Sequence, residues 1–229
     1  MAAEFRHELK YLITMGEYYS LRERLGTFML RDEYAMKRGG VYHIRSLYFD
    51  DMFNSALNEK LGGVALRKKF RIRIYNHGDE DIKLEKKMKQ DKYTAKTSDM
   101  ITREECNNIL IGNYHLLDLA PDRPVLNEFY AELRGKLLRP RVLVDYYREP
   151  YIYPLGNVRI TFDTEIHTGQ FDHNLFSGEN APIPVLSADT MVLEVKFDQF
   201  LPGPIHALLQ SAKGVHMAIS KYVLCRQYQ

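Results

Sequence analysis

The sequence has few cysteines and no long apolar segment, and each shortage excludes a class of protein. Cys106 and Cys225 are the only two cysteines, and they have neither metal-ligand spacing nor a disulfide framework around them. Reduced thiols are therefore expected. The stretch MAAEFRHELKYLIT is charged from residue 4, and no apolar run approaches membrane-spanning length. We expect a soluble cytoplasmic protein without direct membrane insertion.

An excess of one charge is also missing. The 32 Lys and Arg residues nearly balance the 30 Asp and Glu residues, which gives a net charge of +2. This disfavours a bulk nucleic-acid or membrane-surface binder, so any anion site must come from local arrangement. The sequence contains no Walker A loop, GxGxxG, HExxH or CxxC motif. The nucleotide-binding folds that carry these motifs are therefore disfavoured.

The segment 66–89, LRKKFRIRIYNHGDEDIKLEKKMK, predicts a basic β-hairpin. Its first part has a two-residue period, which is a strand signal, and places on one side Arg67, Lys69, Arg71, Arg73 and Tyr75. After a turn at 76–81, the second part places on one side Lys83, Glu85, Lys87 and Lys89. Such like charges repel across strands, so water, counter-ions or a bound anion must offset them. A solvated outer face would explain one such strand, but the pattern recurs elsewhere.

Similar alternation predicts further strands at 5–13, 42–49, 141–148, 157–163 and 191–197, with a turn at 149–156. Helices are expected at 15–29, 50–60, within 97–113, at 127–138 and at 202–213, two of them after the capping boxes Thr14–Glu17 and Thr102–Glu105. Residues 168–189 read as a loop with one short strand, and 219–225 as strand or helix. The pattern predicts an α+β fold whose eight or so antiparallel strands close into a β-barrel with helices packed outside.

The charged faces of these strands form one set: Glu8/Lys10, Lys69/Arg71/Arg73, Glu85/Lys87/Lys89, Arg159/Asp163 and Glu194/Lys196. If the apolar faces pack under helices, the charged faces converge on the barrel interior. An interior lined with Lys and Arg is unstable without compensating charge, and a bound polyanion removes the conflict. The few carboxylates suit a divalent metal held jointly with phosphate oxygens. The pattern indicates triphosphate or polyphosphate chemistry, in which no nucleophilic side chain is required.

At these residues the chain resembles the triphosphate tunnel metalloenzymes (CYTH-like), and among them the vacuolar transporter chaperone (VTC) type of polyphosphate polymerase domain. The matching segments are RHELKY (6–11), RSLYFD (45–50), KFRIRIY (69–75), KLEKKMK (83–89), VDYYREPY (144–151), VRITFDTEI (158–166), LEVKFD (193–198) and SKYVLC (220–225). The resemblance implies one VTC-type domain over residues 1–229, built as an eight-stranded antiparallel tunnel. It also implies transfer of the ATP γ-phosphate onto a growing polyphosphate chain, with Mn²⁺ or Mg²⁺.

The resemblance assigns roles to individual residues. Phosphate-gripping catalytic residues would be Lys10, Arg71, Arg73, Lys87, Arg148, Arg159 and Lys221. Substrate binding would involve Lys89, Tyr146, Ser220 and either Lys96 or Lys92 as a further tunnel lysine. Glu194 would be the metal ligand, while Glu8 and Glu85 would support the metal or tether lysines in structural ion pairs.

Two positions depart from the family patterns. The wider superfamily carries Glu-x-Glu-x-Lys near the N-terminus, and here Arg6 stands where the first Glu would be. This favours the polymerase branch over triphosphatase or adenylate-cyclase relatives. The polymerase pattern also has a lysine three residues before its C-terminal Lys, whereas this chain has Ala218. That difference puts full synthetic activity in question.

Three hypotheses therefore stand beside one another: an ATP-dependent polyphosphate polymerase, a tunnel triphosphatase that hydrolyses nucleoside triphosphate or tripolyphosphate, and a non-catalytic polyphosphate or nucleotide sensor. The Ala218 position is the best support for the sensor. RNA binding would need a basic outer surface with exposed stacking aromatics, and the near-zero net charge makes it the weakest alternative. The sequence contains no signal for an oligomeric state.

Overall fold

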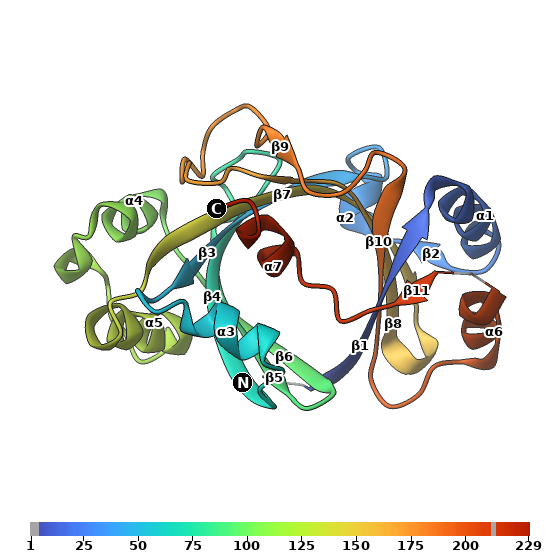
Figure 1. Cartoon of the computed structure of the whole chain (residues 1–229), viewed down its shortest axis with the longest axis horizontal. Coiled ribbons are helices and arrows are strands. Elements are labelled where there is room, and N and C mark those ends of the chain that lie inside the picture. The colour runs from blue at the N-terminus through green and yellow to red at the C-terminus, as the bar shows by residue number, and fades with distance from the viewer. Residues whose placement is uncertain (1–4, 212–213) are drawn as a thin grey trace.

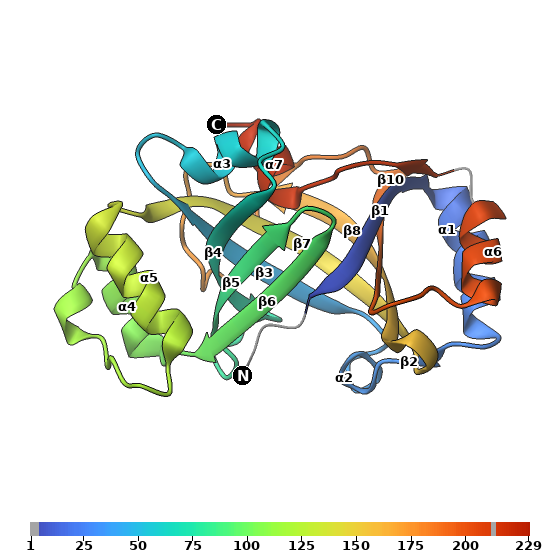
Figure 2. The same cartoon turned by 90° about the horizontal axis from the view of Figure 1, so that it is seen from below.

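Alternating side chains build a closed antiparallel barrel around a polar interior (Figures 1 and 2). The computed structural model of the chain describes residues 5–211 and 214–229. The barrel strands are β1 (Arg6–Thr14), β3 (Tyr42–Asp50), β4 (Leu66–Tyr75), β5 (Lys83–Gln90), β6 (Tyr93–Met100), β7 (Arg139–Tyr153), β8 (Val158–Thr168) and β10 (Thr190–Phe197). Their order is β7-β3-β4-β5-β6-β1-β10-β8, and pairing of β7 with β8 closes the ring. The predicted α+β barrel of eight strands is confirmed.

The basic hairpin is β4 and β5, and its register fixes which cations face each other. Lys69 pairs with Lys87, and Arg71 pairs with Glu85. On the next strand, Lys96 of β6 pairs with Lys87. Because residues in register on one face share a side of the sheet, three lysines form a row across adjacent strands on the interior face.

Helices cover the outer faces on two sides of the barrel (Figure 1). The helices α4 (Arg103–Ile111) and α5 (Pro124–Gly135) cover β4 and β5, where Phe129 of α5 packs against Phe70. The helices α1 (Met15–Gly26) and α6 (Gly203–Ser211) cover β1, β8 and β10. The capping boxes predicted before α1 and α4 are both present. These apolar contacts leave the polar face of each strand to the interior.

Part of the interior wall is apolar and is covered by the C-terminal helix. Tyr48 and Val144 belong to a buried cluster with Tyr222 of α7 (Lys221–Arg226). The carboxylate of Asp50 accepts hydrogen bonds from backbone N–H groups of α3 (Ser55–Leu61) and, at 2.6 Å, from the Tyr222 hydroxyl. The helices α3 and α7 lie at one end of the barrel, here called the α3 end (Figure 2).

Tyrosines gather at the opposite end of β4. The ring of Tyr42 lies 5.0 Å from that of Tyr34, in α2 (Glu33–Met36), and 6.0 Å from that of Tyr75. Tyr75 is the last residue of β4 and Leu66 the first, so these rings lie far from the α3 end. We call this the tyrosine end.

Two local predictions differ from the structure, and one open choice is resolved. Residues 93–100 form β6, which was not predicted, because its small and polar side chains carry little alternation. Residues 149–153 continue β7 instead of forming a turn. Pro150 stands opposite Thr161 of β8, and on its other side it falls between the end of pairing with β3 at Arg148 and the start of pairing with β2 (Leu30–Arg31) at Tyr151, so no ladder on that side needs its missing N–H. The open choice at 219–225 resolves to helix α7, with Ser220 as its N-cap.

Several short elements complete the chain, and some predicted boundaries shift. The helix from residue 15 ends at Gly26 rather than near 29. The long 168–189 segment contains the short strand predicted for it, β9 (Ile183–Pro184). The remaining short elements are β11 (Val215–His216) and the 3₁₀ turns η1 (Tyr114–Leu116) and η2 (Leu155–Asn157).

A buried ion pair anchors the long loop before β9. The Arg45 guanidinium is buried on the outer side of β3 and binds both oxygens of Asp145, at 2.8 and 2.7 Å. It also donates to the Ser177 carbonyl at 2.6 Å. In the part of the chain that the structure describes, no helix is long and apolar enough to cross a membrane.

Candidate functional site

The barrel encloses a cavity of about 330 Å³ to which all eight barrel strands contribute side chains. The structure brings together in its lining most of the predicted site residues: Lys10, Arg71, Arg73, Lys87, Lys96, Tyr146, Arg148, Arg159, Glu194, Ser220 and Lys221. Two further predicted residues, Glu8 and Lys89, line a neighbouring cavity at the α3 end. We refer to the first as the central cavity.

Two arginines of β4 enter the central cavity and are held by Glu85. The Arg71 guanidinium contacts the Glu85 carboxylate at 2.7 and 2.6 Å, and Arg73 lies 3.8 Å from it. Lys96 donates to its other oxygen at 2.7 Å. Burial opposes ionisation of Glu85, but Arg71, Arg73 and Lys96 outweigh it and hold its pKa well below the usual value. Glu85 is fully buried behind the cations and outside the cavity lining, which favours the tether over the metal role.

A second buried group joins the C-terminal helix to the barrel wall. Arg148 binds the Asp163 carboxylate at 2.6 and 2.8 Å, and Lys221 of α7 binds the same group at 2.5 Å. Burial works against the ionised carboxylate, but Arg148 and Lys221 lower its pKa. The Lys221 ammonium also lies 4.8 Å from the centre of the Tyr146 ring. One carboxylate thus positions two cations of the cavity lining.

On β1 and β10, acids and lysines alternate in a cross-strand pattern. Lys10 is in register with Glu194 and Glu8 with Lys196. The Lys10 ammonium lies 3.0 Å from Glu8 and 3.6 Å from Glu194, and Lys196 lies 2.7 Å from Glu194. Lys87 reaches Glu8 from β5 at 2.8 and 2.9 Å. This network joins the two carboxylates through a shared lysine.

The two carboxylates fit a metal ion that arrives with phosphate. Mg²⁺ is usually bound by one or two protein carboxylates together with substrate phosphate oxygens and water. Glu8 and Glu194 offer such a pair, joined through Lys10. Within residues 5–211 and 214–229, no group of three or more His, Cys, Asp or Glu side chains could hold a metal by itself. Phosphate oxygens would therefore have to complete the coordination.

Two lysines of the interior row have lowered pKa values. Burial and the neighbouring Lys10 and Lys196 lower the pKa of Lys87 to about 7, although Glu8 and Glu194 oppose the shift. Lys69 lies opposite Lys87 and contacts the Ser220 hydroxyl at 3.4 Å. Burial and its cationic neighbours hold the pKa of Lys69 well below its usual value. A bound anion would raise both pKa values.

The structure separates the two lysines that the sequence left as alternatives. Lys96 lines the central cavity. Lys92 lies in the turn between β5 and β6 and lines the cavity at the α3 end, with its ammonium 5.3 Å from the Tyr93 ring centre. Lys96 is thus the candidate for the further cavity lysine.

Arg159 and Arg6 line the central cavity while bound to acidic residues at its edge. Arg159 lies 3.1 Å from Asp32 and donates to the Tyr42 hydroxyl at 3.3 Å. Arg6, which stands at the position of a family glutamate, forms an ion pair of 3.1 Å with Asp198. The position that departs from the wider pattern therefore contributes a cation to the cavity.

Several cations near the site were not among the predicted site residues, and Arg6 and Lys196 of the central cavity are two of them. Lys69 and Arg67 share the two-residue period of Arg71 and Arg73, so the strand pattern carried a signal for both. Lys60 of α3 had no such signal. Its ammonium donates to the Ala218 carbonyl at 3.1 Å, which places a cation beside the position where the chain lacks the lysine of the polymerase pattern.

Comparisons with known proteins agree with this fold. One similar solved structure is a Hippeastrum protein that is named as an adenylyl cyclase and described as having a dominant triphosphatase activity. The two chains share 15% identity with a TM-score of 0.58, and the alignment covers 99% of this chain and 96% of that one. A second solved structure, a proposed adenylate cyclase from Bacillus halodurans, has 15% identity and a TM-score of 0.52, covering 92% and 88%. At such identity the likeness shows the fold alone.

The sequence comparisons identify the family. No curated protein sequence matches the chain significantly. The sequence model of the VTC domain matches residues 5–228, nearly the whole chain. The chain therefore belongs to the VTC domain family.

Proposed function

We propose that this protein binds ATP in the central cavity and transfers its γ-phosphate onto a polyphosphate chain. The observation that carries the proposal is the convergence of cations from seven of the eight barrel strands on one cavity, to which β3 adds Tyr42, Ile44 and Tyr48. Arginine provides bidentate forks that match phosphate oxygens, and lysine provides a compact point charge. An extended polyanion fits this lining better than a single small anion, because the cations follow the length of the strands.

The chain's own residues would position the phosphates and stabilise developing charge. Phosphoryl transfer requires mainly positioning and electrostatic stabilisation. Arg71, Arg73 and Arg148 are held in place by buried carboxylates before any ligand arrives, so little reorganisation would accompany binding. Lys87 would add charge from β5, the strand next to β4, and Lys10 from β1.

A metal ion would be held by Glu194 and Glu8 together with phosphate oxygens, and when bound it would supply further neutralisation of phosphate charge. Glu194 already lies 2.7 Å from Lys196, and Glu8 lies 2.8 Å from Lys87. These lysines keep both carboxylates ionised, which is the state a metal requires. Mn²⁺ and Mg²⁺ are the ions that suit oxygen ligands of this kind.

The tyrosine end supports a nucleotide as the phosphate donor. The rings of Tyr34, Tyr42 and Tyr75 lie within 6.0 Å of one another, and Tyr42 and Tyr75 line the central cavity. Aromatic side chains stack on nucleobases with little preference for the base. A base at this end would leave the phosphates pointing toward Arg73 and Arg71.

A tunnel triphosphatase is the second candidate. It is favoured by the similarity to the Hippeastrum protein, which is described as having a dominant triphosphatase activity. Ala218 also favours it, because the polymerase pattern has a lysine there. The two candidates share the same cavity and differ in whether phosphate or water accepts the transferred group.

The test is incubation of the purified protein with ATP and Mn²⁺, followed by separate measurement of long-chain polyphosphate and free orthophosphate. The polymerase proposal predicts polymer that disappears in an Arg71→Ala/Arg73→Ala variant. Lys68→Gln/Lys86→Gln is the matched control, since it removes two cations from the outer face of the same strands. Orthophosphate without polymer would favour the triphosphatase, and tight tripolyphosphate binding without turnover would favour a sensor.

A further inference from the structure

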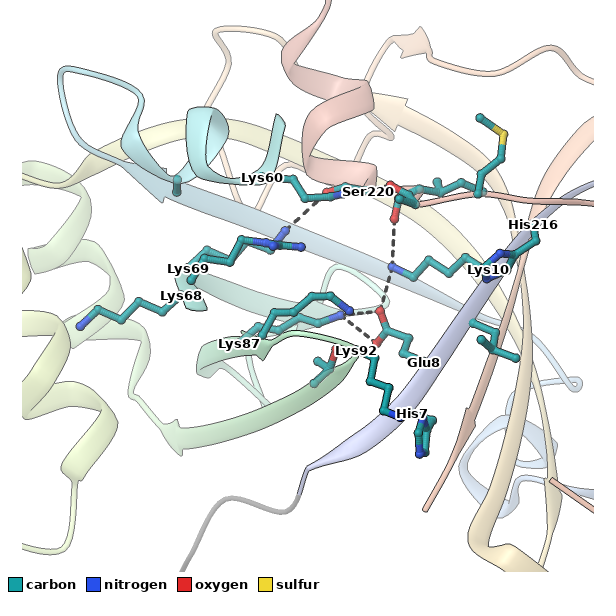
Figure 3. Close-up of a pocket in the computed structure, with 18 residues that line it drawn as sticks. His7, Glu8, Lys10, Lys60, Lys68, Lys69, Lys87, Lys92, His216 and Ser220 are labelled. Carbon is teal, nitrogen blue, oxygen red and sulfur yellow. Dashed lines mark hydrogen bonds and ion pairs between the residues drawn. The ribbon is translucent and has the colours of Figure 1, made fainter. Parts of the chain in front are cut away.

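A second cavity lies at the α3 end of the barrel and is bordered by several cations. Its volume is about 370 Å³, and its lining includes Lys60 of α3, Arg67 at the start of β4 and Lys89 near the end of β5. Arg67 and Lys89 are cross-strand neighbours, so like charges face each other there. Figure 3 shows this cavity, with Lys60, Lys69 and Lys87 at its border.

These cations lack close acidic partners. Lys60 donates to the Ala218 carbonyl at 3.1 Å, and the Arg67 guanidinium donates to the Val64 carbonyl. Across the described ranges 5–211 and 214–229, no carboxylate oxygen lies within 4.0 Å of the charged nitrogens of Lys60, Arg67 or Lys89. Lys60 and Arg67 thus donate to neutral carbonyl oxygens, while Glu8, which also lines this cavity, is bound to Lys10 and Lys87.

Lys68, on the opposite face of the same strand, shows the contrast. Its ammonium lies 2.8 Å from Glu128 and 2.7 Å from Glu132. In Figure 3 its side chain points away from the other labelled lysines. The lack of acidic partners is thus a property of the inner face of β4 at the α3 end, not of the strand as a whole.

The uncompensated cations act on one another. Burial lowers the pKa of Lys60, and Arg67, Lys10 and Lys89 lower it further. Burial also lowers the pKa of Lys89, with Glu8 opposing and Arg67 adding to the shift. At Arg67 burial lowers the pKa, and Glu59 opposes it. An anion bound among these groups would relieve this repulsion.

The second cavity adjoins the central one. Lys10, Lys69, Lys87 and Ser220 line both. Arg67 and Arg71 are four residues apart on one face of β4, which is about 13 Å along a strand. A ligand gripped at Arg71 would need several further phosphate units to reach Arg67.

We propose that Lys60, Arg67 and Lys89 form a second anion-binding subsite, which holds the part of a linear polyphosphate that extends beyond the phosphates in the central cavity. The subsite rests on the proposed function, because it assumes phosphate bound at Arg71 and Arg73. It adds a selection for chain length: tripolyphosphate occupies the central cavity alone, whereas a longer chain reaches both.

The test compares tripolyphosphate with a linear polyphosphate several times longer, using a Lys60→Gln/Arg67→Gln variant of the full chain. Affinity for tripolyphosphate should stay within about twofold, while affinity for the longer chain should fall about fivefold. The salt dependence of the longer chain's affinity should become shallower, because fewer phosphates are neutralised. In the unmutated protein the longer chain should show the steeper salt dependence.

Lys68→Gln/Lys86→Gln removes the same charge from the outer face and should leave both affinities unchanged. The subsite is overturned if the Lys60/Arg67 variant weakens both ligands equally, or if the longer chain binds as before. A larger loss for a single-stranded oligonucleotide than for polyphosphate would overturn it in favour of nucleic acid. If the unmutated protein binds neither phosphate ligand, the proposed function itself fails. Circular dichroism and thermal unfolding verify that each variant is folded.

Discussion

Most cations of the central cavity are paired with carboxylates, whereas Lys60, Arg67 and Lys89 at the α3 end have no carboxylate oxygen within 4.0 Å in the described part of the chain. Arg71 lies 2.6 Å from Glu85 and Arg148 lies 2.6 Å from Asp163. Lys60, by contrast, reaches a backbone carbonyl at 3.1 Å. Both regions are basic and share lining residues, so the difference lies in how the charge is compensated before a ligand binds.

Cations with a carboxylate partner and cations without one contribute differently to stability and to binding. A cation paired with a buried carboxylate is fixed in position, and it stabilises the empty fold as well as a bound anion. A cation without an acidic partner is half-exposed, remains hydrated and adds attraction mainly when an anion arrives. We therefore expect mutations in the central cavity to affect stability and binding together, and mutations at the α3 end to affect binding alone.

The largest effect is expected from the removal of a buried carboxylate that holds cavity cations in place. Asp163→Ala would leave the buried Arg148 and Lys221 without their shared partner. We expect the free energy of unfolding to fall by about 3 kcal/mol, with tripolyphosphate restoring part of it. Chemical denaturation with and without tripolyphosphate measures this. Asp198→Asn, which removes the partner of the more exposed Arg6, should cost about 0.5 kcal/mol or less. Equal losses for the two variants would contradict the comparison.

A smaller effect is expected from losing one cavity arginine while its carboxylate keeps other partners. In Arg71→Gln, Glu85 would still contact Lys96 at 2.7 Å. Affinity for tripolyphosphate should fall roughly 30-fold, as for the loss of one charge-assisted contact of about 2 kcal/mol. Isothermal titration calorimetry measures this, with Arg103→Gln as the control because Arg103 pairs with Asp79 on the outside. An unchanged affinity would place the ligand elsewhere.

Proton uptake on ligand binding is expected to depend on Lys87. Its pKa is lowered from 10.5 to about 7, so the folded, ligand-free protein binds fewer protons than the unfolded chain between these values. Lys87 therefore makes stability rise with pH across this window, and that contribution is lost as pH falls through about 7. A bound phosphate would raise the pKa again, so tripolyphosphate binding near pH 8 should take up as much as about one proton.

Calorimetry at one pH in buffers of different ionisation enthalpy measures this uptake. The Lys87→Met variant is the comparison that matters, since it keeps the ligand's own proton equilibria and removes the lysine. We expect the uptake to shrink in that variant. The same uptake in both proteins would mean that Lys87 does not regain a proton on binding.

The smallest effect is expected on the outer face of the hairpin. Lys68 pairs with Glu128 and Glu132, and its side chain points away from the other labelled lysines of the second cavity. Lys68→Gln should change the free energy of unfolding by about 0.5 kcal/mol and tripolyphosphate affinity by less than about twofold. Thermal unfolding and calorimetry check both values. A large loss of affinity here would mean that the whole hairpin, and not its inner face, attracts the ligand.

The strand pattern predicted much of the candidate site, because its period of two residues assigns side chains to faces. The faces assigned to Lys10, Arg71 and Glu194 agree with the cavity lining. The pattern could not reveal β6, whose Thr94, Ala95 and Ser98 become a strand by pairing with both neighbours rather than through their own propensity. It also could not distinguish Lys92 from Lys96, since that depends on where the turn ends.

The fold determines which residues that are distant in the sequence form contacts. Nothing local to the sequence joins Lys221 to Asp163, which are 58 residues apart, or brings Lys60 to Ala218, which is 158 residues away. From the sequence, Glu85 could either support a metal or tether lysines. The position of Glu85 behind Arg71 in the structure favours the tether. Such choices depend on distances between strands that are remote in the chain.

The sequence by itself determined the alternation of charged and apolar side chains, because that follows from backbone geometry within each strand. The tertiary structure was needed to show that the charged faces meet around one space. It also showed which of their cations have a carboxylate partner and which are left for a ligand. The physical reason is that electrostatic compensation depends on separation and burial, and closure of the barrel sets both.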